Sequence, residues 1–308
     1  MHRSRFALTF ACSLTLVGTL ASPAAARHLP EWFRQVEHGP TDVLVNDVDG
    51  GVRPMRRCGT PVLPEADRQR IEEAAELSRL LLPEGEERKR TIPVAFHVIH
   101  KGAAGNLTDQ EVMAQIDTLD RAYKKFGADF QLVALDRKGK GSWFKKCQKD
   151  GPFNKMTRKL AVDPTHVLNI YTCRPGDNLL GFAIPPGVIP ESHPWNAVVI
   201  HYGSLPNGPL FPYDEGDTLV HEVGHYFSLL HTFENGCSAP GDEVADTPFE
   251  ASPAFGCPIG RDTCSQSGVD PIHNFMDYSD DACLDTFSKK QRARMNQLLP
   301  ILRPGLGN

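Results

Sequence analysis

The sequence predicts an α+β fold, in which strands and helices come first and a loop-rich, cysteine-rich segment comes last. Residues 91–100 (TIPVAFHVIH) form an apolar run rich in β-branched residues, which is typical of a buried strand. A helix signal follows within ten residues, and four of the eight cysteines lie between residues 237 and 283. The 308 residues are enough for one large domain or two small ones.

The helices are predicted from apolar spacing and from capping signals. Residues 65–82 carry apolar residues at helical spacing. The sequence TDQE at 108–111 matches a capping box and predicts a helix over 108–126. A second capping pattern, SKKQ, predicts a C-terminal helix over 287–299 that packs from below.

Further strands are predicted where short β-branched runs lie between turn residues. These runs are residues 130–135, 166–172 and 197–201, with a short edge strand at 181–184 before a proline-rich loop. No internal repeat and no long low-complexity tract interrupt this pattern.

The N-terminus, residues 1–26, has the features of a signal peptide. Basic residues precede an apolar run, and Ala24, Ala25 and Ala26 supply the small residues that a signal peptidase requires. The alternative is a membrane anchor, but the run is short for a spanning helix and ends at a cleavable site. The mature protein is therefore predicted to be soluble, secreted and extracellular, without stable membrane anchoring.

Residues 27–90 differ in composition from the rest and are predicted to be a propeptide. They are rich in proline, glycine and charge, and they end in a charged joint at 84–90 (GEERKR within it). Such an exposed joint suits proteolysis, so removal is predicted at about Arg90–Thr91. A plain surface linker is the alternative.

Because the protein is expected to be exported, its cysteines are expected to form disulfides. Cys12 leaves with the signal peptide, and Cys58 lies far upstream in a polar region. The remaining six cysteines form an even number that is consistent with three disulfides. Sequence alone permits 15 pairings of six cysteines.

Residues 221–231 read HEVGHYFSLLH and predict a catalytic zinc site. On a helix, His221 and His225 lie on one face and can present both imidazoles to one ion. His231 supplies a third ligand if the chain leaves the helix near Ser228. Three protein ligands leave the fourth position of a tetrahedral zinc open for water, and Glu222 is placed to act as the general base on that water.

A second motif, Asn274-Phe275-Met276-Asp277-Tyr278, lies about forty residues downstream. Together the two motifs resemble the pappalysin family of metzincin zinc metalloendopeptidases, and in particular its ulilysin-like secreted bacterial members. The resemblance covers about residues 91–300. It implies that residues 91–308 are a metalloprotease catalytic domain.

The resemblance also implies an architecture and two further roles. An upper subdomain with a twisted mixed sheet and two long helices is expected above an irregular, disulfide-braced lower subdomain, with the zinc cleft between them. Met276 corresponds to the methionine in a tight turn beneath the zinc. Tyr278 corresponds to the tyrosine that stabilises the transition state.

Disulfides, latency and a second metal complete what the resemblance implies. The expected pairs are Cys237–Cys264, Cys257–Cys283 and Cys147–Cys173. Cys58 corresponds to a propeptide cysteine that occupies the open zinc position, although a free thiol or a disulfide to the body of the protein stays open. Calcium is a candidate cofactor at Asp242, Asp246 and Thr247, with an exposed acidic loop as the alternative.

One residue departs from the family pattern. Metzincins carry glycine three residues after the second histidine, where the backbone is usually left-handed, and this chain has Ser228. A left-handed serine costs roughly 1 kcal/mol or more. A degenerate zinc-containing protein that binds peptides without turnover is therefore the rival prediction, and a zinc hydrolase of another substrate is a second one.

Composition adds little about partners. A net charge of −5 and 23% charged residues are ordinary for a globular protein, and no basic patch indicates nucleic acid. Protein or peptide substrates are expected. Asp280 and Asp281, just after the methionine turn, are candidates for favouring basic residues in the substrate. The sequence gives no indication of oligomeric state.

Overall fold

A five-stranded mixed sheet forms the centre of the fold, with the order β4-β3-β5-β7-β6. The structure is a computed structural model that describes residues 42–46, 50–81, 89–176 and 178–307, so the predicted signal peptide lies outside the described residues. Four strands run parallel and β6 runs antiparallel to β7 at one edge. The strands are β3 (Arg90–His100), β4 (Ala128–Gly139), β5 (Leu168–Cys173), β6 (Gly181–Ala183) and β7 (Ala197–His201).

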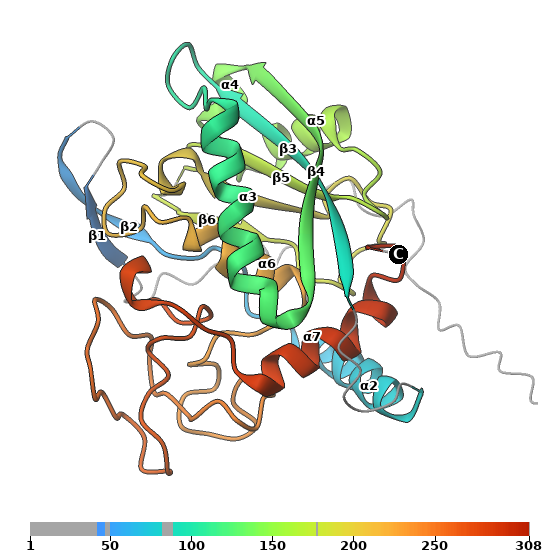
Figure 1. The fold of residues 1–308 in the computed structure, drawn as a ribbon, viewed down its shortest axis with the longest axis vertical. Coiled ribbons are helices and arrows are strands. Elements are labelled where there is room, and N and C mark those ends of the chain that lie inside the picture. The colour runs from blue at the N-terminus through green and yellow to red at the C-terminus, as the bar shows by residue number, and fades with distance from the viewer. Residues whose placement is uncertain (1–41, 47–49, 82–88, 177, 308) are drawn as a thin grey trace, which may run out of the picture.

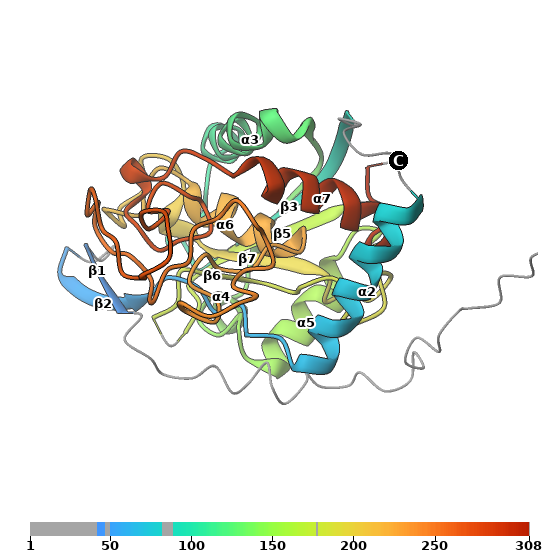
Figure 2. The ribbon, with the colours of Figure 1, turned by 90° about the horizontal axis from the view of Figure 1, so that it is seen from below.

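Helices cover both faces of the sheet (Figures 1 and 2). On one face, α3 (Asp109–Tyr123) and α6 (Asp217–Tyr226) share a hydrophobic core with β3, β5 and β7. On the other, α4 (Gly141–Phe144) and α5 (Asp150–Leu160) enclose a second apolar cluster. Because β3 is buried on both faces, its sequence is a mostly apolar run, interrupted by His97, rather than an alternating one.

The lower part of the molecule, after α6, consists mainly of loops and ends in α7 (Lys289–Leu302). The short 3₁₀ turns along the chain are η1 (Lys124–Phe126), η2 (Tyr202–Ser204) and η3 (Asp281–Cys283). Disulfides join Cys237 to Cys264 and Cys257 to Cys283 in these loops, and Cys147 to Cys173 beside the sheet. These are the three pairs that the resemblance implied, and they hold loops that contribute few regular backbone hydrogen bonds.

The segment before the sheet is more ordered than the sequence predicted. A hairpin of β1 (Asp42–Asn46) and β2 (Val52–Arg56) packs Val43, Val45 and Met55 against the main domain. The helix α2 (Glu65–Leu81), predicted from its apolar spacing, lies against α7 (Figure 2).

Most of the predicted elements are confirmed, with shifted ends. Both capping boxes form, at Thr108 with Glu111 and at Ser288 with Gln291. The strand predicted at 130–135 is twice as long, because β4 pairs with β3 along its whole length. The β1–β2 hairpin, α4 and α5 were not predicted. Among the residues that the structure describes, no helix has the length and apolar character to cross a membrane.

Candidate metal centre

Helix α6 carries the first two predicted zinc ligands one turn apart. It begins after Gly216, whose φ of 94° turns the chain into the helix, and every one of its ten residues is buried. Its apolar side chains, Leu219, Val220 and Val223, belong to the core under the sheet. The helix is thereby fixed in rotation, with His221 and His225 turned to the opposite side.

The three histidines converge through their Nε2 atoms. His225 Nε2 lies 3.1 Å from His221 Nε2 and 3.0 Å from His231 Nε2. The Nδ1 atoms of His221 and His225 donate to the carbonyl oxygens of Phe275 (2.7 Å) and Leu229 (2.8 Å). A carbonyl only accepts, so in the neutral rings the proton is on Nδ1 and the Nε2 lone pairs point at one another.

This arrangement fits a bound zinc ion. Burial lowers the pKa of His225 to about 4, which keeps the imidazole in its neutral, metal-binding form. Tetrahedral Zn–N bonds of about 2.0–2.1 Å require nitrogens about 3.3 Å apart, close to the separations here. Cys58 Sγ joins the same cluster, in which all ligand atoms lie within 4.8 Å of one another. Three imidazoles and one thiolate complete a tetrahedral zinc set.

Ser228 adopts the left-handed backbone that its position demands, with φ 75°. The turn still brings His231 to the other two histidines, so the left-handed serine is compatible with the three-histidine site. Ser228→Gly is expected to relieve the left-handed strain and raise the free energy of unfolding by about 0.5 kcal/mol, after the greater flexibility of glycine in the unfolded chain is subtracted. Urea denaturation would measure the change. Ser228→Ala keeps the strain and serves as control; an equal gain there would contradict the explanation.

Met276, predicted in a turn beneath the zinc, packs against α6 at Gly224. Its side chain is fully buried, and a Cβ on Gly224 would lie 2.4 Å from its Sδ atom. Gly224 therefore has to be glycine for the helix to approach this turn. Gly224 was not predicted as a site residue, although this glycine lies between His221 and His225.

Glu222 is fully buried and is contacted by residues that precede the central sheet. Its Oε2 accepts a 2.8 Å hydrogen bond from Thr60 Oγ1 and lies 3.5 Å from Cys58 Sγ. Burial raises the pKa of this carboxyl to about 7. Thr60 Oγ1 also accepts from Ala183 N of β6 at 2.8 Å, so Thr60 joins the carboxylate to the edge strand. Thr60 was not predicted, although it lies only two residues after Cys58.

Tyr278 lies beside the third histidine. Its hydroxyl is 3.2 Å from His231 Nε2, and its main-chain oxygen accepts a 2.9 Å hydrogen bond from the Tyr213 hydroxyl. Burial raises the pKa of Tyr278, which keeps its phenol protonated and able to donate. All the predicted zinc-site residues are thus brought together.

Next to Cys58, Arg57 fills a buried pocket beyond the zinc site. Its Nη1 donates to Thr218 Oγ1 at 2.8 Å, and Nη2 lies 3.7 Å from Asp281 Oδ1. Its guanidinium lies over the ring of Tyr213, 4.9 Å from the centroid. Of the two predicted acidic residues, Asp281 therefore faces the pocket and forms an ion pair, whereas no ion pair is formed by Asp280 within the described chain.

The predicted calcium residues do not all point to one place. Asp242 Oδ2 and Thr247 Oγ1 are both buried and without a hydrogen-bond partner. Asp246 has a different role, because its carboxylate accepts from Ser288 Oγ and Lys290 N at the start of α7. Across the described residues, no group of three His, Cys, Asp or Glu ligand atoms includes Asp242.

Comparison with known proteins agrees with this site. Residues 206–300 match the peptidase M43 family, described as pregnancy-associated plasma protein-A. The chain is 38% identical to an extracellular metalloprotease of Neurospora crassa over 77% of this chain and 86% of that protein. It is 36% identical to extracellular metalloprotease 1 of Coccidioides posadasii, over 81% and 91% of the two chains.

Solved structures show the same fold. A mutant of promirolysin from Tannerella forsythia superposes with a TM-score of 0.68 at 26% identity, over 77% of this chain and 89% of that one. Mature mirolysin in complex with a cleaved peptide gives a TM-score of 0.61 at 27% identity, over 72% and 99%. The described fold is therefore that of a metzincin with a zinc site at His221, His225 and His231, and the chain belongs to the pappalysins, peptidase family M43, as an extracellular zinc metalloprotease.

Proposed function

We propose that this protease is made as a latent precursor and, once processed, cleaves protein substrates next to basic residues, with Glu222 and Tyr278 as its catalytic side chains. The observation that carries the proposal is that residues 57–60 contact both the three-histidine cluster and the carboxylate of Glu222. The thiol of Cys58 lies near the histidines, and the hydroxyl of Thr60 donates to the carboxylate of Glu222. A segment that blocks each of these groups is the expected form of a protease inhibitor.

Each catalytic side chain has a distinct task. A zinc ion held by His221, His225 and His231 would supply Lewis-acid chemistry, by polarising the scissile carbonyl and lowering the pKa of a nearby water. Glu222, freed from Thr60, would accept a proton at its carboxylate and return it to the leaving amine, which is the task of a general acid–base group. Tyr278 donates a hydrogen bond to the oxygen that gains negative charge.

The contacts of Arg90 favour a processing site that is N-terminal to the boundary predicted from the sequence. Arg90 is the first residue of β3; its N–H donates to Gly127 O and its side chain donates to Asn296 Oδ1 at 3.0 Å. Cleavage at Arg90–Thr91 would have to open a paired, buried strand. We therefore propose that the propeptide, from residue 27 onward, ends within the joint before Arg90.

Arg57 indicates the substrate preference. A pocket formed by Asp281, Thr218 and the Tyr213 ring holds its guanidinium and would hold an arginine or lysine of a substrate in the same way. The preference is tested by cleavage of a mixed peptide library by the processed enzyme, with all cut sites sequenced.

Asp281→Asn is expected to lower kcat/KM for peptides cut at a basic residue by about 30-fold, because about 2 kcal/mol is lost when a buried charge loses its partner. Peptides without a basic residue should lose much less, so the library preference should flatten. Asp285→Asn is the matched control, since this carboxylate is exposed and has no described contact with Arg57. An unchanged preference in Asp281→Asn would contradict the assignment.

Calcium is proposed at Asp242 and Thr247, without Asp246. The two buried oxygens without partners fit a cation that prefers hard oxygen ligands, and burial raises the pKa of Asp242 to about 7. Saturating calcium is expected to raise the melting temperature of the zinc-loaded protein by roughly 5 °C. Asp242→Asn should abolish this shift. Asp246→Asn should lower stability but keep the shift, and loss of the shift there instead would contradict the proposal.

We also propose that the chain belongs to the ulilysin-like bacterial branch of the family. The mirolysin structures support it, whereas the sequence relatives described above are fungal.

A further inference from the structure

Helix α2 binds the catalytic domain with one face. Arg68, Ile71, Glu72 and Ala75 recur at helical spacing and are turned toward α7 and the loops near the zinc site. Ile71 and Ala75 pack on Leu298 in a small hydrophobic cluster. One turn further on, Ser78 Oγ donates to Gln297 O at 2.7 Å.

The charges on this surface of the catalytic domain are ordered. At one end, Arg68 lies 3.1 Å from Glu243 and 3.9 Å from Glu234. At the other end, both terminal nitrogens of Arg294 pair with the carboxylate of Glu72. We call the surface formed by Glu234, Glu243, Arg294 and Leu298 the α2 groove.

Removal of the propeptide would leave the guanidinium of Arg294, in the α2 groove, without its partner Glu72. In the described chain, the carboxylate that pairs with Arg294 comes from α2. The guanidinium is largely buried and its Nε donates to Ser228 O at 3.2 Å, so packing holds it in place. A preorganised charge of this kind binds a complementary partner with little loss of entropy.

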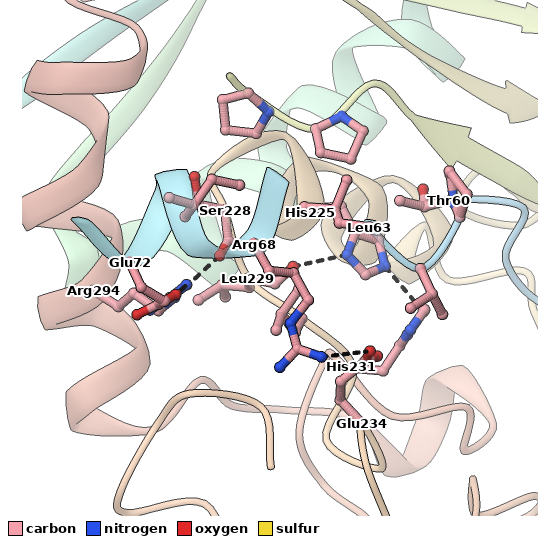
Figure 3. Close-up of a pocket in the computed structure, with 16 residues that line it drawn as sticks. Thr60, Leu63, Arg68, Glu72, His225, Ser228, Leu229, His231, Glu234 and Arg294 are labelled. Carbon is pink, nitrogen blue, oxygen red and sulfur yellow. Dashed lines mark hydrogen bonds and ion pairs between the residues drawn. The ribbon is translucent and has the colours of Figure 1, made fainter. Parts of the chain in front are cut away.

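The groove is continuous with the zinc site. A single pocket is lined by Arg68, Glu72 and Arg294 on one side and by His225 and His231 on the other (Figure 3). A ligand seated in the α2 groove can therefore extend directly over the metal centre. The propeptide itself does so, since residues 57–60 lie at the zinc site and α2 follows.

We propose that the α2 groove is an exosite of the processed enzyme, which binds an amphipathic helix of a protein substrate. The helix would carry a basic residue toward Glu234 and Glu243, an acidic residue one turn later toward Arg294, and small apolar residues against Leu298. This inference rests on the proposed function, in which Arg57 occupies a substrate pocket. The remainder of the propeptide then marks the path of a longer substrate.

The test uses the full chain, processed and freed of its propeptide, and three substrates. The first is a short fluorogenic peptide with one arginine; the second is the same peptide joined by a flexible glycine–serine linker, at either end, to the sequence of residues 61–81. The third carries R68E and E72R in that helix. We expect kcat/KM for the second substrate to exceed that of the first by about tenfold through a lower KM, and the third to lose this gain.

An enzyme variant provides the reciprocal control. Glu243→Arg should favour a helix carrying R68E alone over the unchanged helix, each measured relative to the short peptide with the same enzyme. Equal cleavage of all substrates would overturn the exosite, and so would slower cleavage of the second substrate, which would mark the groove as a site for the propeptide alone. Failure to cut even the short peptide would instead refute the proposed function.

Discussion

Replacing Glu222 by alanine is expected to lower peptide cleavage by the processed enzyme by about 10²- to 10⁴-fold, the usual contribution of a general acid–base group. Glu222 is not one of the predicted zinc ligands, and the Nε2 atoms of the three histidines converge without it. Zinc should therefore stay bound at one ion per chain. Peptide turnover and metal analysis on the same preparation measure both effects.

A carboxylate elsewhere on the catalytic domain gives the matched control. Asp129 is exposed on β4, far from the zinc site in the sheet order, and Asp129→Ala should retain full activity. Cleavage by Glu222→Ala at the rate of the Asp129 variant would refute the role of general base. Loss of zinc together with activity would show that Glu222 supports the metal site instead.

Replacing Cys58 by alanine is expected to raise the initial activity of the freshly purified full chain by about 100-fold, equivalent to about 3 kcal/mol of blocking free energy. The thiol belongs to the same ligand cluster as the three histidines, so its removal opens the fourth ligand position, while Thr60 stays on Glu222. Cleavage of a fluorogenic arginine peptide is followed in the first minutes, while gel electrophoresis shows the chain to be unprocessed.

Further substitutions, added to Cys58→Ala, distinguish which contacts of the N-terminal segment maintain latency. Adding Thr60→Val should increase the activity further, because the Glu222 carboxylate loses its hydrogen-bond donor. Adding Glu222→Ala should abolish it, which ensures that the activity measured belongs to this site. If Cys58→Ala stays as inactive as the natural chain while holding zinc, then Arg57 and Thr60, rather than the thiol, maintain latency.

Local patterns explain why the zinc helix and the sheet were predictable. The spacing of His221 and His225 fixes one face of a helix, and the apolar run of β3 reflects burial on both sides. The capping boxes of α3 and α7 are local as well. Such signals depend on residues a few positions apart, so a single sequence contains them.

The rest depends on contacts between distant residues. Thr60 and Glu222 are 162 positions apart, and Arg57 and Thr218 are 161 apart. Neither pairing leaves a periodic signal in the sequence. The β1–β2 hairpin was missed for a similar reason: its strands are short, one contains Pro54, and the burial of Val43 and Val45 depends on Leu180 and Tyr213 of the main domain.

The order of elements in the precursor has a kinetic consequence. The blocking residues 57–60 and helix α2 both precede the joint at which we propose that the chain is cut. The helix α2 is held on the catalytic domain by packing and by ion pairs to Glu243 and Arg294. A single cut therefore leaves an intact inhibitor attached without a covalent bond. The onset of activity is then set by dissociation of that fragment, and the final activity by its rebinding. Dilution suppresses rebinding, so more of the enzyme is active in a dilute solution than in a compartment where the fragment accumulates.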